Sequence, residues 1–520
     1  MSTLSIRLTA SAAMLLSSID LHADEKQWTL DSQEEWQKNI SPHDDVEIKD
    51  GTISSPEKTV TLQSAMKSFP EKRSAHSITI TQSPIWQNWE PAGNIGPRHM
   101  GGAPIFLRKG DKDYWAFGKA SKNQKVKTNS KDVTLDGFDI PLKASNTPNQ
   151  FFAPGGLKGN KGGYHGWQSR DMVNWVYHGP VTPERAGWAT TAELVDGKAY
   201  IYYDYPNDQD PHLVIDADLT DGVPGKDMGM AFEDPSHGSD SVIIRDLEGK
   251  FHLILEDWSP IDASTHAWDS PLAMHAVSND GIKNFKILPP AVDERTKPTG
   301  QFAEFFHPHW HLGEHKNKFP NKPVPKNIPQ HRMKKGQIRG YAKYEIHEPE
   351  QNAYGDWAAI SIDNQYYLFC DFDPVGGHGK NAMSVGWFTS SNINEKFTFC
   401  DDIGQGHPDP DIMFAAGKFH LITQTPKDFV SPGPWVDGVE VRVGVDTNKD
   451  GKINQWTEWQ NVKESYHGVP GFAKQVAKTP AQMDLSKLPD GFGFQFEVRL
   501  TDTTKNKSKP ILDKVTVTFR

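Results

Sequence analysis

A β-hairpin pattern recurs five times in this chain between residues 103 and 424. Each copy has a short apolar segment, a turn rich in Gly, Asp or Asn, and a second segment rich in aromatic residues. Such a pattern is typical of a hairpin, and its repetition at blade-sized intervals predicts a β-propeller. The copies begin at uneven intervals, at Ala103, Thr191, Ser241, Ala358 and Pro410. Loops of very different length must connect them, and such loops on a rigid scaffold commonly carry binding and catalytic residues.

The regions on either side of the repeats follow another pattern. Strict apolar–polar alternation, which predicts antiparallel strands with one buried face, is found in residues 439–445, 492–500 and 515–519. We therefore expect an all-β chain in which residues 93–436 form a five-bladed propeller. Residues 24–92 and 437–520 are expected to form one accessory β-sandwich from the two chain ends. The alternative is that these regions supply further blades, giving a six- or seven-bladed propeller.

Charge and the N-terminal sequence narrow the class of protein. A formal net charge of −11 argues against a nucleic-acid binder. No apolar run approaches the ~20 residues of a membrane helix. Arg7, a mildly apolar stretch and Ala23 are arranged as in a secretory signal peptide covering residues 1–23, although a start that remains on the protein is the alternative. We expect a secreted or periplasmic protein.

The two cysteines are expected to be free. Cys370 lies on a predicted second strand and Cys400 on the outer strand of the same repeat. Two strand spacings amount to about 9.6 Å, which exceeds the Cα separation that a disulfide spans. The prediction is two buried free thiols.

An Asp-rich segment near the C-terminus predicts a metal site. Oxygen-bearing side chains alternate here, with Gly451 at the sixth position, as at the start of a calcium loop. An EF-hand would have Glu at position twelve, where Thr457 stands, and a strand precedes the segment. The sequence therefore predicts a structural Ca²⁺ in a β context, and the alternative is an Asx-rich turn. The candidate ligands are Asp446, Asn448, Asp450, Lys452, Asn454 and Glu458.

Acidic residues also stand where the first strands of several repeats begin. Asp240, Asp356 and Asp409 open three repeats, the second repeat has Glu193, and the first has Gly102. First strands line the central tunnel of a propeller, so these carboxylates are expected to converge at one mouth. Like charges in proximity raise at least one pKa, which lets one carboxyl act as acid and another as base in glycoside hydrolysis. The alternative is that each Asp only caps backbone amides.

Together these motifs resemble the five-bladed propeller glycosidases of glycoside hydrolase families 43 and 117. The resemblance covers about residues 95–430 and is carried by the strand-opening Asp residues, the aromatic hairpins and the turn Ser169-Arg-Asp-Met-Val-Asn-Trp175. It implies carboxylates in a central cleft acting as acid, base and orienting group, by position Asp240, Asp356, Asp409 and Glu193. The chain departs from family 43 at Gly102, where that family has its general-base Asp.

A second chemistry is suggested by a more distant resemblance to propeller-type ulvan lyases, which use His and Tyr as base and acid and a cation to neutralise a uronate. The candidates for these catalytic roles are His165 and His307, with Tyr164, Trp167, His237, His309, Trp310, Arg185 and Arg295 as substrate-binding residues. His307, His309 and His311 are a less favoured alternative as ligands of Zn²⁺. Trp-rich loops also leave open a non-catalytic sugar-binding propeller.

The expected function is that of a secreted glycoside hydrolase acting on a polysaccharide or its oligosaccharides. An algal source of the substrate is implied by the resemblance alone. Residues 311–340 form the one strongly basic stretch, and it is either a solvated insertion or a rim that handles an anionic sugar. A polysaccharide lyase and a sugar-binding propeller are the alternatives.

Overall fold

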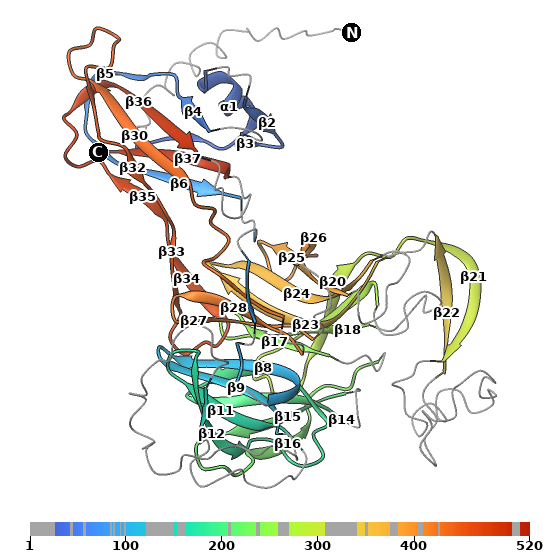
Figure 1. Ribbon diagram of the computed structural model, residues 1–520. Coiled ribbons are helices and arrows are strands. Elements are labelled where there is room, and N and C mark those ends of the chain that lie inside the picture. The colour runs from blue at the N-terminus through green and yellow to red at the C-terminus, as the bar shows by residue number, and fades with distance from the viewer. Residues whose placement is uncertain are drawn as a thin grey trace, which may run out of the picture. The chain divides into compact units, whose positions relative to one another are not determined.

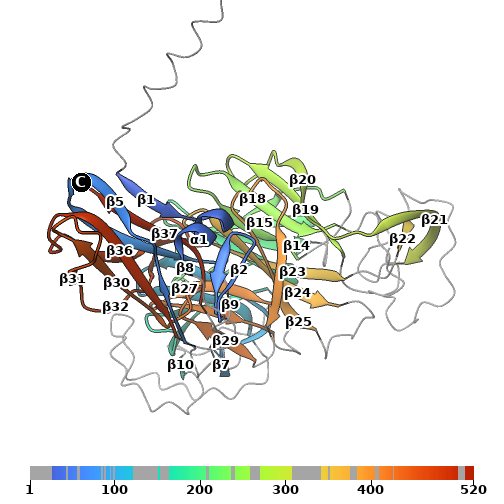
Figure 2. The same cartoon turned by 90° about the horizontal axis from the view of Figure 1, so that it is seen from above.

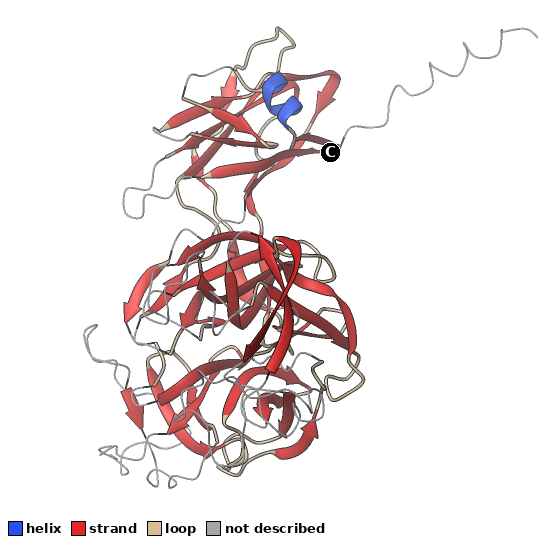
Figure 3. Cartoon of the chain, turned by 90° about the vertical axis from the view of Figure 1, so that its right-hand side faces the viewer, coloured by secondary structure: helices blue, strands red, loops and turns tan. Residues whose placement is uncertain are grey.

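The computed structural model describes the chain from residue 26 to residue 520, with gaps. The residues outside the description within this range are 42–44, 56–58, 84–85, 87–88, 94, 98–99, 121–149, 153–162, 206–209, 236–239, 258–269, 307–340, 349–351, 375–382, 404–408, 425–426 and 502–509. The described residues are almost entirely strands and loops (Figure 3), as predicted. They divide into two compact units, one of them Trp89–Gly433 with Tyr466–Lys478, and the other Met1–Asn88 with Pro434–Ser465 and Thr479–Arg520.

Each sequence repeat forms the first two strands of a sheet in the larger unit (Figure 1). Sheet one contains β8 (Met100–Gly110), β9 (Asp113–Ala120), β11 (His165–Ser169), β12 (Asn174–Pro180) and the outermost β10 (Gln150–Phe152). Sheet two contains β13 (Trp188–Val195), β14 (Lys198–Tyr205), β15 (Asp210–Asp216) and β16 (Lys226–Met230). Sheet three contains β17 (Val242–Arg245), β18 (Phe251–Glu256), β19 (Leu272–Ser278) and β20 (Lys286–Asp293).

Sheets four and five complete this unit. Sheet four contains β23 (Ala353–Ile362), β24 (Gln365–Asp373), β25 (Ser384–Ser390) and β26 (Thr398–Ile403). Sheet five contains β27 (Asp411–Ala415), β28 (Lys418–Ile422), β29 (Asp428–Ser431) and β7 (Glu90–Gly93). Figure 2 shows strands of sheets three and four in sequence order. A separate pair, β21 (Lys297–Phe306) and β22 (Tyr341–Glu348), lies between sheets three and four along the chain.

The first strands of these sheets form a closed ring. β8 contacts β13, β13 contacts β17, β17 contacts β23, β23 contacts β27, and β27 returns to β8. Every residue of β18 is buried, because neighbouring sheets pack on both of its faces, and most of its residues are apolar although His252 and Glu256 are buried with them. β7 comes from before the first repeat and pairs with β29 as the outermost strand of sheet five, so this sheet combines the two ends of the repeat region. The arrangement is propeller-like.

A segment from the C-terminal part of the chain, Tyr466–Lys478, belongs to this unit, and we name it the return segment. Its strand β34 (Gln475–Thr479) pairs in parallel with the end of β23, and β33 (Ser465–Gly468) lies outside β34. Arg108 in sheet one donates to the carbonyls of Gly468 at 3.2 Å and Val469 at 3.3 Å. The Tyr466 ring meets Phe419 of sheet five at 5.3 Å. The return segment therefore joins the far ends of several first strands.

The smaller unit is the predicted sandwich except for the return segment, which was predicted to belong to it and belongs to the larger unit. Both chain ends contribute to both of its sheets. One sheet contains β2 (Glu47–Lys49), β3 (Thr52–Ser54), β37 (Ile511–Phe519), β6 (Ala75–Gln82), β35 (Ala481–Asp484) and β1 (Gln27–Leu30). The other contains β31 (Gln455–Trp456), β30 (Val439–Asp446), β36 (Gly491–Leu500), β4 (Val60–Gln63), β32 (Gln460–Asn461) and β5 (Lys67–Arg73). β30 pairs with β36 in one of these two sheets, and neither sheet contains a repeat strand.

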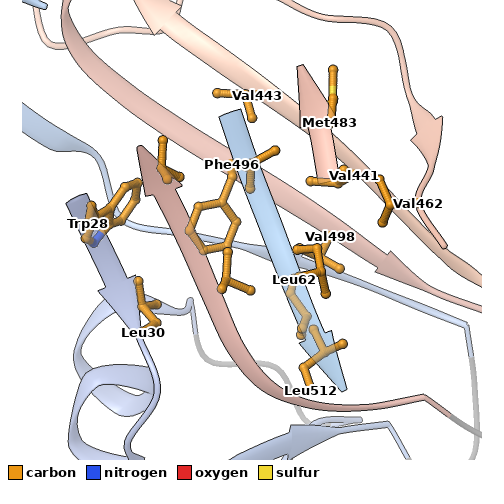
Figure 4. Packing of buried hydrophobic residues seen from close by; sticks show 14 of the residues in the cluster. Trp28, Leu30, Leu62, Val441, Val443, Val462, Met483, Phe496, Val498 and Leu512 are labelled. Atoms are coloured by element: carbon orange, nitrogen blue, oxygen red, sulfur yellow. The ribbon is translucent and has the colours of Figure 1, made fainter. Parts of the chain in front are cut away.

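One hydrophobic core lies between the two sheets of the sandwich, as Figure 4 shows for part of it. Trp28 from the N-terminal end contacts Phe496 from the C-terminal end with ring centroids 5.1 Å apart. The alternating residues of β30 and β36, among them Val441 and Val498, are fully buried. A short helix, α1 (Gln33–Asn39), begins at the N-cap Ser32 and buries Trp36 in the same core.

Both cysteines are free. Cys370 is buried, as predicted, but Cys400 is exposed. The prediction of a second buried thiol is wrong because β26 is the outermost strand of sheet four, and no strand of that sheet covers it. Among the described residues no helix is long and apolar enough to cross a membrane.

Candidate functional site

Three of the predicted aspartates share an unusual backbone conformation. Asp240, Asp356 and Asp409 have positive φ angles of 57°, 49° and 55°. Such a conformation costs on the order of 1–3 kcal/mol for a residue with a Cβ, and it clusters at functional sites. Gly102 has a φ of 79° at the corresponding place in sheet one. The ladders of sheets one and four shift register here, and such bulges redirect the side chain that they carry.

A second row of acidic residues anchors these aspartates. Asp204, Glu256 and Asp371 lie at or near the ends of the second strands of sheets two, three and four. Each accepts a hydrogen bond from the backbone N–H of the strand-opening Asp of the next sheet: Asp204 from Asp240 at 3.2 Å, Glu256 from Asp356 at 3.3 Å, and Asp371 from Asp409 at 2.8 Å. These bonds hold the left-handed residues in place. The carboxylates that accept hydrogen bonds from backbone amides here are therefore those of the second row, and not those of the strand-opening aspartates, as the alternative reading of the sequence supposed.

The two rows form one carboxylate cluster. Side-chain oxygens of Asp240, Glu256 and Asp356 lie within 4.8 Å of one another, and so do those of Asp356, Asp371 and Asp409. Asp356 belongs to both groups and lies at the centre of the cluster. Carboxylate oxygens in this density are also ligands that Ca²⁺ or Mg²⁺ prefers.

Asp356 is the group most suited to carry a proton. Burial raises its pKa well above the usual range, the charges of Asp240, Asp409 and Asp371 raise it further, and a side-chain hydrogen bond to Asp409 acts in the same direction. Like charges this close cannot all ionise. The cluster thus combines a protonated carboxyl with ionised carboxylates in one place, which is the chemical requirement for general acid–base catalysis.

Tyr164 lies beside this cluster. Its side chain is fully buried, and its hydroxyl donates to the carbonyl of Ala103 at 2.8 Å. Burial raises the pKa of Tyr164 well above its usual value, and the charges of Asp409 and Asp240 add to the effect. The phenol therefore stays protonated at neutral pH, and its proton is directed to the carbonyl of Ala103.

Glu193 has a structural role, contrary to the sequence prediction. It is fully buried, and it accepts hydrogen bonds from the backbone N–H groups of Leu194 at 2.9 Å and Ala473 at 2.8 Å. Ala473 belongs to the return segment. Glu193 points inward further along β13 than the strand-opening position, so it secures the return segment and does not join the carboxylate cluster.

Two other predictions in sheet one need correction. His165 is buried, its Nδ1 lies 2.8 Å from the hydroxyl of Tyr177, and its ring stacks on that of Tyr177. Trp167 is also buried and packs at 5.5 Å against Tyr177. The two residues lie two positions apart on β11, so their side chains share one face of the strand. They fill that core, and neither is exposed to bind a sugar.

The two predicted arginines have acidic partners. Arg185 donates to Asp227 at 2.6 Å and to the hydroxyl of Tyr203 at 3.1 Å, and lies 4.8 Å from the ring centre of Tyr205. Arg295 donates through two nitrogens to Asp293, each at 2.8 Å. Their role as substrate-binding residues stays a prediction. His237, His307, His309 and Trp310, with the zinc alternative, lie outside the described residues.

The Asp-rich loop after β30 is closed by its own hydrogen bonds. Asp446 accepts from the backbone amides of Asn448 at 3.1 Å, Lys449 at 2.7 Å and Gly451 at 2.9 Å. The carboxylate of Asp450 caps Lys452, and Asn454 donates to Asn448 at 3.1 Å. Calcium binding stays a prediction. Asp446 would have to hold the ion while its oxygens also accept backbone hydrogens.

The second row of carboxylates was not among the predicted site residues. Neither was Lys119, which occupies in the second strand of sheet one the position that Asp371 occupies in sheet four. The sequence does contain a pattern that could have found them. Counted from the first aromatic or apolar residue, the sixth position of the second strand is Lys119, Asp204, Glu256 and Asp371 in repeats one to four. Hairpin pairing brings this position opposite the start of the first strand.

No family model and no curated protein matches the chain. Solved structures with a similar fold include a thermostable family-43 glycoside hydrolase, which is 11% identical, with 64% of this chain and 88% of that chain covered and a TM-score of 0.36. The Cellvibrio cellulosa alpha-L-arabinanase complexed with arabinohexaose is 11% identical, with 72% and 95% covered and a TM-score of 0.36. RS223 beta-xylosidase is 12% identical, with 66% and 93% covered and a TM-score of 0.35. Structural similarities this remote do not assign an activity to the chain.

Proposed function

We propose that the protein is a glycoside hydrolase that cleaves a polysaccharide or its oligosaccharides at the carboxylate cluster. The observation that carries the proposal is the raised pKa of Asp356, caused by burial and by the neighbouring charges of Asp240, Asp409 and Asp371. Hydrolysis of a glycosidic bond needs a carboxylic acid and a carboxylate near the same bond. Neighbouring strands of one rigid ring supply both.

In this mechanism Asp356 donates its proton to the glycosidic oxygen as the bond between that oxygen and the anomeric carbon breaks. An ionised neighbour, Asp240 or Asp409, stabilises the positive charge that develops on the sugar ring or removes a proton from the attacking water. Water then adds to the anomeric carbon, one of its protons passes to a carboxylate of the cluster and the other stays on the new hydroxyl group. Transfer of the first proton within the cluster or through solvent restores protonated Asp356. General acid–base assistance of this kind is worth typically 10²–10⁴-fold in rate.

The finer parts of the proposal concern where the enzyme acts and which polysaccharide it cleaves. An exported enzyme acting on a large extracellular polysaccharide is supported by the signal-like residues 1–23. An algal polysaccharide is proposed from the sequence resemblance alone. A lyase is the second chemistry to test, and the same experiment distinguishes it.

The test is to incubate the full chain with a panel of neutral and anionic plant and algal polysaccharides. Hydrolysis releases reducing ends without an ultraviolet-absorbing product, whereas a lyase produces an unsaturated sugar that absorbs. We expect reducing ends alone, with a large loss in at least one of Asp240→Asn, Asp356→Asn and Asp409→Asn. Asp402→Asn, an exposed position on β26, is the matched control. An unsaturated product, or full activity in all three variants, contradicts the proposal.

A further inference from the structure

Sheet one breaks the acidic pattern of the ring mouth. Lys119 pairs with the residue before Gly102 in the same way that Asp371 pairs with the residue before Asp356. Gly102 and Asp356 also share the left-handed conformation, with φ angles of 79° and 49°. Sheet one therefore has glycine and lysine at the two positions where sheet four has two acids.

The lysine side chain fills the space that the glycine leaves. A Cβ built on Gly102 would lie 3.1 Å from both Cγ and Cδ of Lys119, and 3.4 Å from the hydroxyl oxygen of Tyr164. A side chain at residue 102 would press against this lysine stem, which would have to shift by a few tenths of an ångström, and would also be strained by the positive φ. The absence of an Asp in sheet one is thus part of a local arrangement, in which Lys119 and Tyr164 replace it.

Lys119 reaches toward the next sheet. Its Nζ lies 3.1 Å from the ring centre of Trp188, the first residue of β13, a cation–π contact that restricts where the ammonium can lie. Asp204, Glu256 and Asp371 reach the next sheet in the same sense. Since the first strands contact in a ring, the border of sheets one and two lies across the ring from sheet four. The mouth is therefore cationic on one side and acidic on the other.

We propose that Lys119 is a specificity-determining residue that binds an anionic substituent of the substrate sugar, a carboxylate or a sulfate ester. This inference rests on the proposed glycoside hydrolase function. An anionic group is repelled by the carboxylate cluster and attracted by the ammonium, so its charge orients the sugar across the mouth. The half-buried Trp188 ring beside Lys119 offers an apolar surface to the same sugar. An uncharged substituent gains nothing from this polarity.

Three tetrasaccharides test the inference: one of galacturonate, one of sulfated galactose and one of neutral galactose. Binding is measured by calorimetry and cleavage by reducing ends, for the unaltered chain, Lys119→Met and Lys119→Arg. Lys198→Met, an exposed lysine at the start of β14, is the matched control. We expect one or both anionic sugars to bind at least about tenfold more tightly than the neutral one. Lys119→Met should abolish that difference, and Lys119→Arg should keep most of it. Which anionic sugar is preferred tells carboxylate from sulfate.

Two results overturn the inference while leaving the proposed function intact. One is cleavage of the neutral sugar with no preference for either anionic sugar. The other is an equal loss of kcat on all substrates in Lys119→Met without a change in binding, which would make Lys119 only a counter-charge for the carboxylates. If no sugar of any class is bound or cleaved, the proposed function fails first and the inference fails with it.

Discussion

Asp356 and Asp446 are both aspartates on β-strands, Asp356 at a bulge in β23 and Asp446 at the end of β30, but their surroundings act on their pKa values in opposite directions. Burial and neighbouring carboxylates raise the pKa of Asp356 well above its usual value. Although desolvation opposes ionisation of Asp446, hydrogen bonds from the backbone amides of Gly451, Lys449 and Asn448 lower its pKa. The first carboxyl is held in a state that costs stability, and the second supports its own loop. Residue type and a position on a strand alone therefore do not distinguish a candidate catalytic aspartate from a structural one.

The largest expected difference is in activity. Asp356→Asn is close to isosteric and removes the proton that the proposed mechanism transfers, so turnover should fall by about 10²–10⁴-fold. Asp446→Asn should leave turnover within about twofold, because the loop after β30 belongs to the smaller unit. Initial rates on one polysaccharide, with both variants checked for folding by circular dichroism, make the measurement. Comparable losses in the two variants would remove the functional distinction between these aspartates.

The pH dependence of activity should follow the same contrast. If protonated Asp356 is the acid, activity falls as pH rises through its raised pKa, and the descending limb reports this group. The mutation Asp371→Asn removes one of the charges that raise this pKa, so the descending limb should move to lower pH. Rates at saturating substrate across the pH range provide the test. An unchanged limb in Asp371→Asn would mean that another group controls it.

The two substitutions should change the melting temperature in opposite directions. A folded-state pKa above the unfolded value gives stability that is present below the ordinary Asp pKa of about 3.9 and is lost as pH rises through the raised pKa. Asparagine needs no proton and can donate to the same carboxylates, so Asp356→Asn should melt higher than the unaltered chain at neutral pH. Asp446 contributes stability above the ordinary pKa, which is lost as pH falls through its lowered pKa. Asp446→Asn should therefore melt lower, and calorimetry at several pH values decides between these signs.

The hairpin repeats predicted the propeller-like sheets, and the strict alternation in the terminal regions predicted the sandwich, because period-two patterning and turn residues are local properties of the sequence. The convergence of Asp240, Asp356 and Asp409 also followed, since repeats place equivalent residues together. His165 was misassigned because its burial against Tyr177 depends on how β11 and β12 pair and pack, and Glu193 because its environment depends on a contact distant in sequence. Glu193 meets Ala473 of the return segment, which no repeat predicts. The burial of a carboxyl, and hence the opposite pKa shifts of Asp356 and Asp446, is determined only when the strands pack together.

The return segment provides a smaller but specific effect on stability. Glu193→Gln makes the acceptor of the backbone N–H groups of Leu194 and Ala473 neutral, and it places a donating amide opposite the backbone N–H of Arg245, which the second carboxylate oxygen accepts at 3.4 Å. Leaving such buried donors poorly paired costs about 1–3 kcal/mol. The free energy of unfolding of the larger unit, followed by denaturant titration, should fall by this amount. Glu233→Gln at an exposed position is the control. No change in Glu193→Gln would show that the return segment is dispensable for this unit.

The remaining prediction concerns the loop that contains Asp446, where the effect depends on the Ca²⁺ concentration. If it binds Ca²⁺, the ion stabilises the folded chain by RT ln(1 + [Ca²⁺]/Kd), about 2.7 kcal/mol at a hundredfold excess over Kd, and only in the unit that contains the loop. The melting temperature should then rise with Ca²⁺ and fall with a chelator, and Asp450→Ala should remove the response without changing turnover. Asp450 is the better probe than Asp446, because its exposed side chain accepts one backbone hydrogen bond, from Lys452, and one from the side chain of Asn448, whereas Asp446 accepts three backbone hydrogen bonds within the loop. A melting temperature that ignores both Ca²⁺ and chelator would leave the loop as an Asx-rich turn, held by the same amide hydrogen bonds that lower the pKa of Asp446.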